Sequence, residues 1–169
     1  MNRLLYSLVT AAILAAMLLI GPGDVVAQTS TEGVDVILIV DTSGSMRAND
    51  PEAIRVSAAK LFIDLSSRGD RVAVISMSGG EFTEVKTKLT RISAWLDDVQ
   101  AERRALKENL DELAEPTKGG TFMGTALQLA YDILDKTEPG RRQFVVLLTD
   151  GVPEREDPSI LPAVLEKFE

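Results

Sequence analysis

Five oxygen-bearing side chains fall in three short, glycine-containing segments that lie far apart in the chain. They are Asp41, Ser43 and Ser45 in the segment DTSGS, Thr121 in the segment KGGT, and Asp150 in the segment TDG. Two carboxylates and three hydroxyls, with no nitrogen or sulfur ligand, suit hard cations such as Mg²⁺, Mn²⁺ or Ca²⁺. Hydroxyl ligands carry no charge, so an ion held this way would keep positive charge for a carboxylate from another molecule. If the fold brings the segments together, they predict a divalent-cation site, with Mg²⁺ as the expected ion.

The residue types that are missing narrow the chemistry further. The 169 residues include no Cys and no His, which excludes disulfide bridges, thiol catalysis and zinc–thiolate sites and removes the commonest general base. The chain has 18 Lys and Arg against 26 Asp and Glu, which gives a net charge of −8. This acidity argues against nucleic acid as a partner, because binding to phosphates depends on Lys and Arg.

The apolar pattern predicts the elements that would bring the three segments together. Nearly continuous apolar runs over Val34–Asp41, Arg71–Ser78 and Gln143–Thr149 are typical of parallel strands buried on both faces. Glu84–Ile92 alternates apolar and polar residues, which predicts an antiparallel edge strand. We therefore expect an α/β fold with a Rossmann-like, doubly wound, mostly parallel sheet flanked by helices. The carboxyl ends of parallel strands lie at one sheet edge, where the segments DTSGS and TDG would meet.

Helical periodicity fills the segments between these strands. Asp50 and Pro51 predict the start of the first helix, as its N-cap and its first helical residue. Arg55 and Lys60 are placed opposite a predicted inward face made of Ile54, Ala58, Leu61, Phe62 and Leu65. Further helices are predicted in the charged stretch that carries Val99 and Leu106 and ends before Pro116, between the loop at 118–121 and Gly140, and from about Pro158 to Phe168. Two glycines, Gly44 and Gly120, are expected to allow close backbone approach around the predicted ion site.

The three polar segments together resemble a known binding site. The segment DTSGS has the DxSxS form of the metal ion-dependent adhesion site of von Willebrand factor type A domains. The segments GGT, at 119–121, and TDG, at 149–151, resemble the loops that supply that site's threonine and second aspartate. The resemblance extends from Val34 to about Pro153. Two further stretches, DPEAIRVSAAKLFIDL and GDRVAVISMS, look like the first helix and the second strand of secreted or membrane-associated bacterial members of the family.

The resemblance implies a role for each of the five residues. Ser43, Ser45 and Thr121 would coordinate the ion, Asp41 and Asp150 would act directly or through water, and an Asp or Glu of a protein partner would complete the shell. The implied function is that of a non-catalytic, metal-dependent module for adhesion or assembly.

Two other interpretations of the same residues stay open. Asp, Ser, Thr and Gly also favour turns and helix caps, so the chain could be a metal-free structural domain. Asp41 could instead be the nucleophile of a phosphatase-like enzyme. Enzymes of that kind have the motif DxDx[TV], in which the first Asp would correspond to Asp41. In this chain the second carboxylate of that motif is replaced by Ser43, whose hydroxyl is a poor general acid or base.

The first 33 residues have the features of an export signal and a linker. One positive charge at Arg3 precedes an apolar run, a Pro-Gly break and the small-residue site VVA, which predicts a signal peptide over residues 1–27. An uncleaved signal anchor is the alternative, because the run approaches the length of a membrane span. Residues 28–33 are then a linker. In both cases we expect an extracytoplasmic domain that is secreted, periplasmic or held at the cell surface.

Residues 34–169 are predicted to form a type A domain that is incomplete at its C-terminus. The family resemblance implies the strand order 3-2-1-4-5-6, and only four strands are found in the sequence. The strand Gln143–Thr149 would then be an uncovered apolar edge, so we expect the chain to aggregate or to dimerise through it. A further membrane span beyond the chain could tether the domain, as in bacterial relatives.

Overall fold

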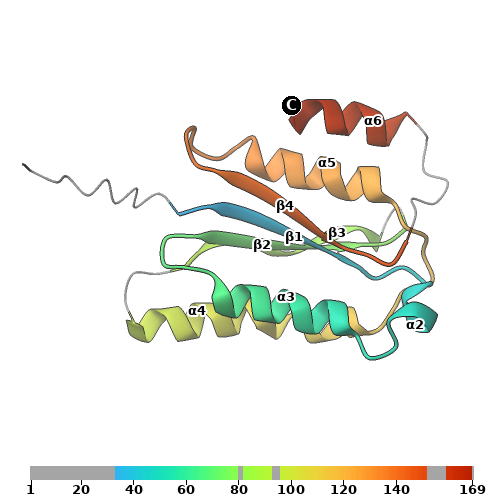
Figure 1. Ribbon diagram of the computed structural model, residues 1–169, viewed down its shortest axis with the longest axis horizontal. Coiled ribbons are helices and arrows are strands. Elements are labelled where there is room, and N and C mark those ends of the chain that lie inside the picture. Colours follow the sequence, from blue (N-terminus) through green and yellow to red (C-terminus); the bar gives the residue numbers. More distant parts are fainter. Residues whose placement is uncertain (1–32, 80–81, 93–95, 152–158, 169) are drawn as a thin grey trace, which may run out of the picture. The chain divides into compact units, whose positions relative to one another are not determined.

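A four-stranded sheet with helices on both faces forms the described part of the chain (Figure 1). The computed structural model describes residues 33–79, 82–92, 96–151 and 159–168. The predicted signal segment 1–27, and all but the last residue of the predicted linker 28–33, lie outside these residues. The strand order is β3-β2-β1-β4, which confirms the order predicted for these four strands.

The central strand is β1 (Asp35–Asp41), and all seven of its residues are buried. It pairs in parallel with β2 (Arg71–Met77) on one side and with β4 (Gln143–Leu148) on the other. A strand with neighbours on both sides and helices on both faces has no solvent-facing side, which explains its continuous apolar run. β3 (Glu84–Arg91) pairs antiparallel with β2, as its alternating sequence predicts.

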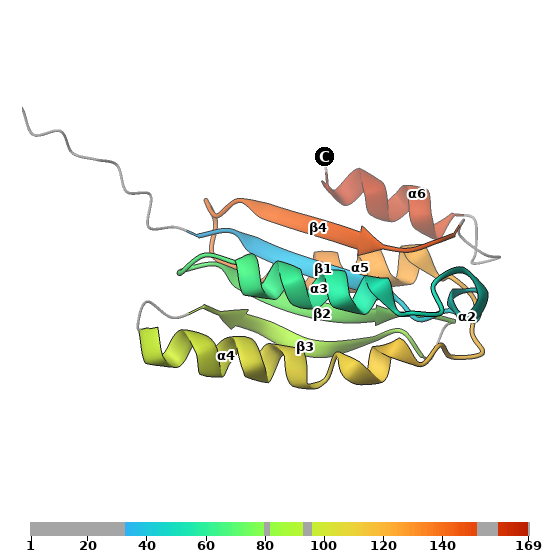
Figure 2. The same cartoon turned by 60° about the horizontal axis from the view of Figure 1, so that its bottom comes forward.

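Two layers of helices cover the sheet, and each layer closes an apolar core of its own (Figure 2). α3 (Ile54–Leu65) and α4 (Leu96–Glu108) cover one face, whereas α5 (Met123–Leu134) and α6 (Ile160–Leu165) cover the other. The even-numbered apolar residues of β1 point into the α3 core, and its odd-numbered isoleucines point into the α5 core. β1 is therefore held from both sides, with its carboxyl end in a fixed position.

Three shorter elements complete the described part of the chain. They are α2 (Met46–Asn49), η2 (Asp111–Ala114) and η3 (Glu166–Phe168). None of the helices in the described ranges has the length and apolar character that crossing a membrane requires.

The start of α3 differs from the prediction. The helix begins at Ile54, after Ala53 with its positive φ of 52°, and not at Pro51. Asp50 nevertheless caps the helix from a position further back in the chain. Its Oδ1 accepts a hydrogen bond from the backbone N–H of Ile54 (2.7 Å), and its Oδ2 accepts one from the N–H of Arg55 (3.1 Å). A carboxylate at this end also suits the positive end of the helix dipole.

The predicted inward face of α3 was wrong. The side chains that are buried belong to Arg55, Val56, Ala59 and Ile63, whereas three residues of the predicted face are 58 to 74% exposed, namely Ile54, Leu61 and Leu65. Ala58 is exposed as well, and Phe62 is only partly buried against the core. Because the helix carries apolar residues on two faces, their spacing alone does not select the face that meets the sheet.

A buried ion-pair network closes the amino end of β1. The Asp35 carboxylate is fully buried and accepts hydrogen bonds from Arg71 (2.7 and 2.5 Å) and from Arg141 (2.8 Å). Burial alone would raise the pKa of Asp35, but hydrogen bonds and charges from the two arginines outweigh it and hold the pKa below its ordinary value. At the amino end of β1 the buried Asp35 carboxylate is therefore paired with two arginine side chains.

Candidate functional site

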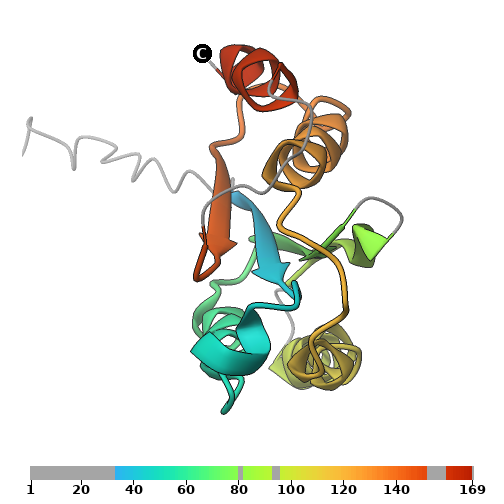
Figure 3. The same cartoon turned by 90° about the vertical axis from the view of Figure 1, so that its right-hand side faces the viewer.

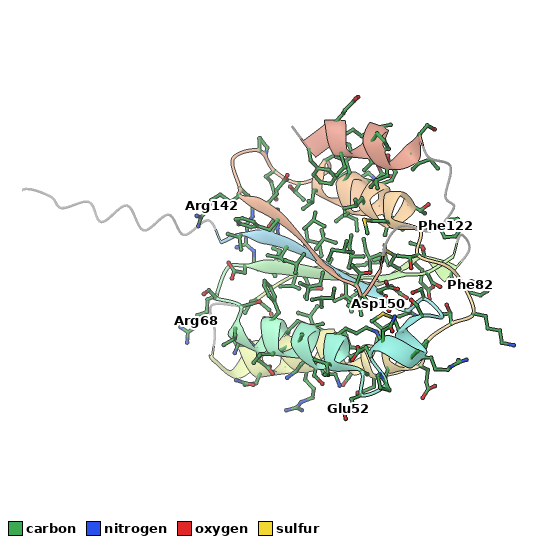
Figure 4. The ribbon with its side chains drawn as sticks, turned by 45° about the vertical axis from the view of Figure 1, so that its right-hand side comes forward. Glu52, Arg68, Phe82, Phe122, Arg142 and Asp150 are labelled. Atoms are coloured by element: carbon green, nitrogen blue, oxygen red, sulfur yellow. The ribbon has the colours of Figure 1, made fainter. Side chains whose placement is uncertain are left out.

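The carboxyl ends of β1 and β4 bring two of the three polar segments into direct contact. Ser43 Oγ and Ser45 Oγ lie 3.0 Å apart in the loop that follows β1. Ser45 Oγ donates a hydrogen bond to Oδ1 of Asp150 (3.2 Å), although the two residues are 105 positions apart. Ser45 and Asp150 are exposed, whereas Ser43 is buried. The group is thus open to solvent on the side of Asp150, which Figure 4 labels beyond the end of β4.

Asp41 lies beneath these hydroxyls and is fully buried. Its Oδ1 accepts a hydrogen bond from the backbone N–H of Ser43 (2.8 Å), and its Oδ2 accepts one from Thr149 Oγ1 (2.6 Å). Among the residues that the structure describes, no Lys or Arg forms an ion pair with this carboxylate. Burying a charge without a paired charge is costly. At this end of β1 the buried carboxylate therefore has hydrogen-bond donors but, within the described residues, no cationic partner.

The third segment meets the first two through backbone contacts. The N–H of Gly44 donates a hydrogen bond to the carbonyl oxygen of Gly119 (2.9 Å), which joins the loop after β1 to the loop before α5. Thr121 is buried, and a Cβ added at Gly151 would lie 3.7 Å from Thr121 Oγ1. The Thr121 hydroxyl therefore lies beside the Asp150-Gly151 turn. All five predicted residues are found at one edge of the sheet.

This cluster is rich in hydroxyls and not in carboxylates. In the described ranges there is no group of three or more acidic side chains that would hold an ion by charge alone. A hard divalent cation at this position would instead meet two carboxylates and three uncharged hydroxyls.

Comparison with known proteins identifies the fold family. The family model of the von Willebrand factor type A (VWA) domain matches residues 35–167. The chain belongs to this family. Among solved structures, it is similar to a von Willebrand factor type A protein from Catenulispora acidiphila, at 33% identity and a TM-score of 0.63, over 80% of this chain and 30% of that one.

Two further relatives contain a similar segment within a longer chain. The pilus adhesin SpaC from Lactobacillus rhamnosus GG is 26% identical, with a TM-score of 0.57, over 72% of this chain and 15% of that one. Matrilin-3 from Gallus gallus is 27% identical over 130 residues, which are 72% of this chain and 26% of the relative. The chain thus spans less than a third of the length of these relatives.

Arg55 supports the loop that follows β1 by hydrogen bonds from its guanidinium. The sequence pattern had predicted that this side chain faces solvent. Its guanidinium donates to the carbonyl oxygen of Asp41 (2.6 Å), to the carboxylate of Asp50 (2.8 Å), and to the carbonyl oxygens of Leu113 (2.8 Å) and Ala114 (3.2 Å). Only 5% of the residue is exposed. Burial alone would raise the pKa of Asp50, but the hydrogen bonds from Arg55 and Ile54 hold it below its ordinary value.

Two further side chains position the predicted ligands and were missed in the sequence. Asn49 Nδ2 donates a hydrogen bond to Oδ2 of Asp150 (2.6 Å), so Asn49 and Ser45 hold the two oxygens of that carboxylate. Thr149 Oγ1 donates to Asp41 and accepts from the N–H of Gly151 (3.1 Å). Thr149 could have been noticed, because it belongs to the TDG segment. Nothing in the spacing of Asn49 indicates its contact.

Gly119 is the glycine of the site whose backbone lies too close to a neighbouring segment to leave room for a side chain. A Cβ at Gly119 would lie 2.5 Å from the backbone nitrogen of Gly79 and 2.5 Å from Ser78 Oγ. A Cβ at Gly44 would meet nothing closer than the carbonyl oxygen of Thr117, at 3.5 Å. The steric role that the sequence assigned to Gly44 therefore belongs to Gly119.

Gly119→Ala is expected to lower the free energy of unfolding by about 1–3 kcal/mol, because backbone atoms must shift to accept the methyl group. The matched variant Gly44→Ala is expected to change it by less than about 0.5 kcal/mol, as ordinary surface substitutions do. Urea unfolding of both variants measures the difference. Equal midpoints for the two would show that the approach of Gly119 to Gly79 is not tight in solution.

Proposed function

We propose that this VWA domain binds a protein partner through a divalent cation at the carboxyl edge of its sheet. The observation that carries the proposal is the Asp41 carboxylate, which is fully buried and, within the described residues, has no cationic partner. Two other carboxylates in contact with β1 or its following loop do have one, since Asp35 binds Arg71 and Arg141 and Asp50 binds Arg55. A cation would supply for Asp41 what the arginines supply elsewhere.

The residues at the site suit Mg²⁺, and Mn²⁺ or Ca²⁺ would be accepted by the same oxygens. We propose that Ser43, Ser45 and Thr121 provide the hydroxyl ligands and that the carboxylates of Asp41 and Asp150 act on the ion directly or through water. Five side-chain oxygens would leave room for a further ligand in a shell of about six, and the exposed residues Ser45 and Asp150 are the ones through which a partner would reach the ion. There the ion would attract an Asp or Glu side chain of the partner.

The relatives support a binding function, because one of them is a pilus adhesin. They also support a setting outside the cytoplasm, which agrees with the signal segment predicted over residues 1–27. The sequence favours this function over a phosphatase-like one, because Ser43 stands where the motif DxDx[TV] has the second carboxylate that such an enzyme needs as acid and base.

Divalent ions are expected to stabilise the folded domain and to lose this effect in Asp41→Asn. An ion at 100 times its dissociation constant adds about 2.7 kcal/mol if it ignores the unfolded chain. Thermal unfolding in EDTA and in about 10 mM Mg²⁺, which saturates weak extracellular sites, measures the increment. The exposed Asp135→Asn is the matched control and should keep the full shift. If wild type melts equally in EDTA and Mg²⁺, the ion site is disproved.

Binding of the partner is expected to require both the ion and the threonine ligand. In a pull-down from the native extracytoplasmic fraction, a partner retained by wild type in Mg²⁺ should be lost in EDTA, which removes the ion, and in Thr121→Ala, which removes one ligand from a shell of about six oxygens. Lys107→Ala, which only breaks a surface pair with Asp64, should retain the partner. Retention by the Thr121 variant would place the contact elsewhere on the domain.

A further inference from the structure

We propose that Asn49 sets the ion preference of the site, because it holds Asp150 in a position that serves Mg²⁺ and denies Ca²⁺ a second carboxylate oxygen. The inference deepens the proposed function and rests on it, since it concerns the same ion. Asn49 is the last residue of α2 and belongs to none of the three polar segments. Figure 3 looks onto the carboxyl ends of β1 and β4, with α2 beside them.

The two ions differ in the ligands that they require. Mg²⁺ takes about six oxygens in a near-ideal octahedron at about 2.0–2.1 Å, whereas Ca²⁺ takes about six to eight at about 2.3–2.6 Å, often with both oxygens of one carboxylate. A site discriminates between them by its size, by the number of its ligands and by its flexibility. A carboxylate that can turn only one oxygen to the ion therefore favours Mg²⁺.

The two oxygens of Asp150 are held by donors at the two ends of α2. Ser45 is the N-cap of this helix and Asn49 its last residue, so the two side chains lie one turn apart on the same helix face. Ser45 Oγ donates to Oδ1 (3.2 Å), and Asn49 Nδ2 donates to Oδ2 (2.6 Å). Because only Ser45 is a proposed ligand, Oδ1 is the oxygen on the side of the ligand hydroxyls. Oδ2 is turned along the helix toward Asn49.

The other carboxylate of the site is more firmly held. Asp41 is fully buried, and its two oxygens accept hydrogen bonds from the backbone N–H of Ser43 and from the hydroxyl of Thr149. Asp150 is exposed. It is therefore the carboxylate that can turn when a donor is lost, and the position of its second oxygen depends on Asn49.

The loop with the two serines is tied on both sides, which opposes the widening that a larger ion needs. Thr42 of this loop is buried, and its backbone N–H and hydroxyl both donate to the carbonyl oxygen of Met77 in β2 (2.8 and 3.1 Å). Its own carbonyl oxygen accepts from the N–H (2.8 Å) and the hydroxyl (2.9 Å) of Thr117. The adjustable ligand of the site is therefore Asp150.

Asn49→Ala is expected to shift the preference of the site toward Ca²⁺. Oδ2 of Asp150 would lose its donor and could turn to the ion, which adds a ligand for Ca²⁺ but has no place in the octahedral shell of Mg²⁺. Mn²⁺ bound to the full chain is followed by electron paramagnetic resonance and displaced by Mg²⁺ or Ca²⁺, which gives both dissociation constants. Their ratio, Ca²⁺ over Mg²⁺, should fall about tenfold, as the loss of one hydrogen bond to a charged group allows.

Asn109→Ala is the matched control. Asn109 is exposed and follows α4 directly, in a groove that contains none of the five proposed ligands. This variant should keep the ratio of wild type. Damage to the fold would weaken both ions alike, so the ratio separates the positioning of Asp150 from stability. Circular dichroism confirms that each variant is folded.

Infrared difference spectra give a second measurement, of the binding mode itself. The symmetric and antisymmetric stretches of a carboxylate lie closer together when both of its oxygens bind one ion. Adding Ca²⁺ should produce this change in Asn49→Ala and not in wild type.

Three results would overturn the role of Asn49 and leave the ion site in place. They are an unchanged ratio in Asn49→Ala, a wild type that prefers Ca²⁺, and the two-oxygen signature in wild type loaded with Ca²⁺. A wild type that binds no Mn²⁺ would overturn the ion site and the role of Asn49 together.

Discussion

Replacing Arg55 by methionine is expected to lower the free energy of unfolding by about 3–5 kcal/mol, as the removal of one partner from a buried ion pair does. The side chain of Arg55 is 3% exposed and that of Asp50 is 11% exposed, so Asp50 would lose its cation in a place that water reaches poorly. The carbonyl oxygens of Asp41 and Leu113 would lose a donor as well. Methionine keeps most of the volume, so the loss reports on charge and hydrogen bonds.

A second lysine or arginine on the same helix provides the matched control. Lys60 pairs with Asp111, whose side chain is 80% exposed. Exposed pairs contribute about 0–1 kcal/mol, so Lys60→Met should unfold close to wild type. Urea unfolding of the two variants compares a buried cation with an exposed one. If Arg55→Met cost no more than Lys60→Met, Arg55 would not be the support of the loop that follows β1.

Arg55 also shows where prediction from sequence reached its limit. The strands were predictable because continuous apolar runs such as VILIV suit few environments other than a sheet covered on both faces. The run FVVLL does form the strand β4, but its residues are exposed or only half-buried, so the burial expected for it was wrong. α3 has apolar residues on two faces, and a charged residue was expected to face solvent. Arg55 is buried because backbone carbonyl oxygens from η2 and β1 converge on it, and this convergence exists only in the folded chain.

The candidate ligands of the site were predictable from the sequence, whereas the side chains that position them were not. Asp41, the serines and Asp150 were found because the residue types and the strand ends point to one edge of a parallel sheet. The residues that hold them were not found, since the contact of Asn49 with Asp150 spans 101 positions and depends on how two loops cross. Ion binding and the signal segment stay predictions.

Asp35→Asn is expected to lower the free energy of unfolding by about 3–5 kcal/mol at neutral pH, because Arg71 and Arg141 would lose their shared buried carboxylate. The pKa of Asp35 is lowered in the folded protein, since its arginine partners outweigh the effect of burial. A lowered folded-state pKa contributes stability above the unfolded pKa of about 3.9, and this contribution is lost as the pH falls through the folded value. Acid unfolding below about pH 4 should therefore be shallower in the variant.

The two ends of β1 give opposite expectations for the ion, which separates stability from binding. Asp35 and Asp41 are six residues apart on one strand, or about 20 Å at 3.3 Å per residue. Asp35→Asn should therefore keep the full increment in melting temperature on adding Mg²⁺, although its baseline is lower. Asp41→Asn should lose the increment. If Asp35→Asn also lost the increment in melting temperature, the effect of Mg²⁺ would depend on the stability of the whole domain and not on a site at the carboxyl end of β1.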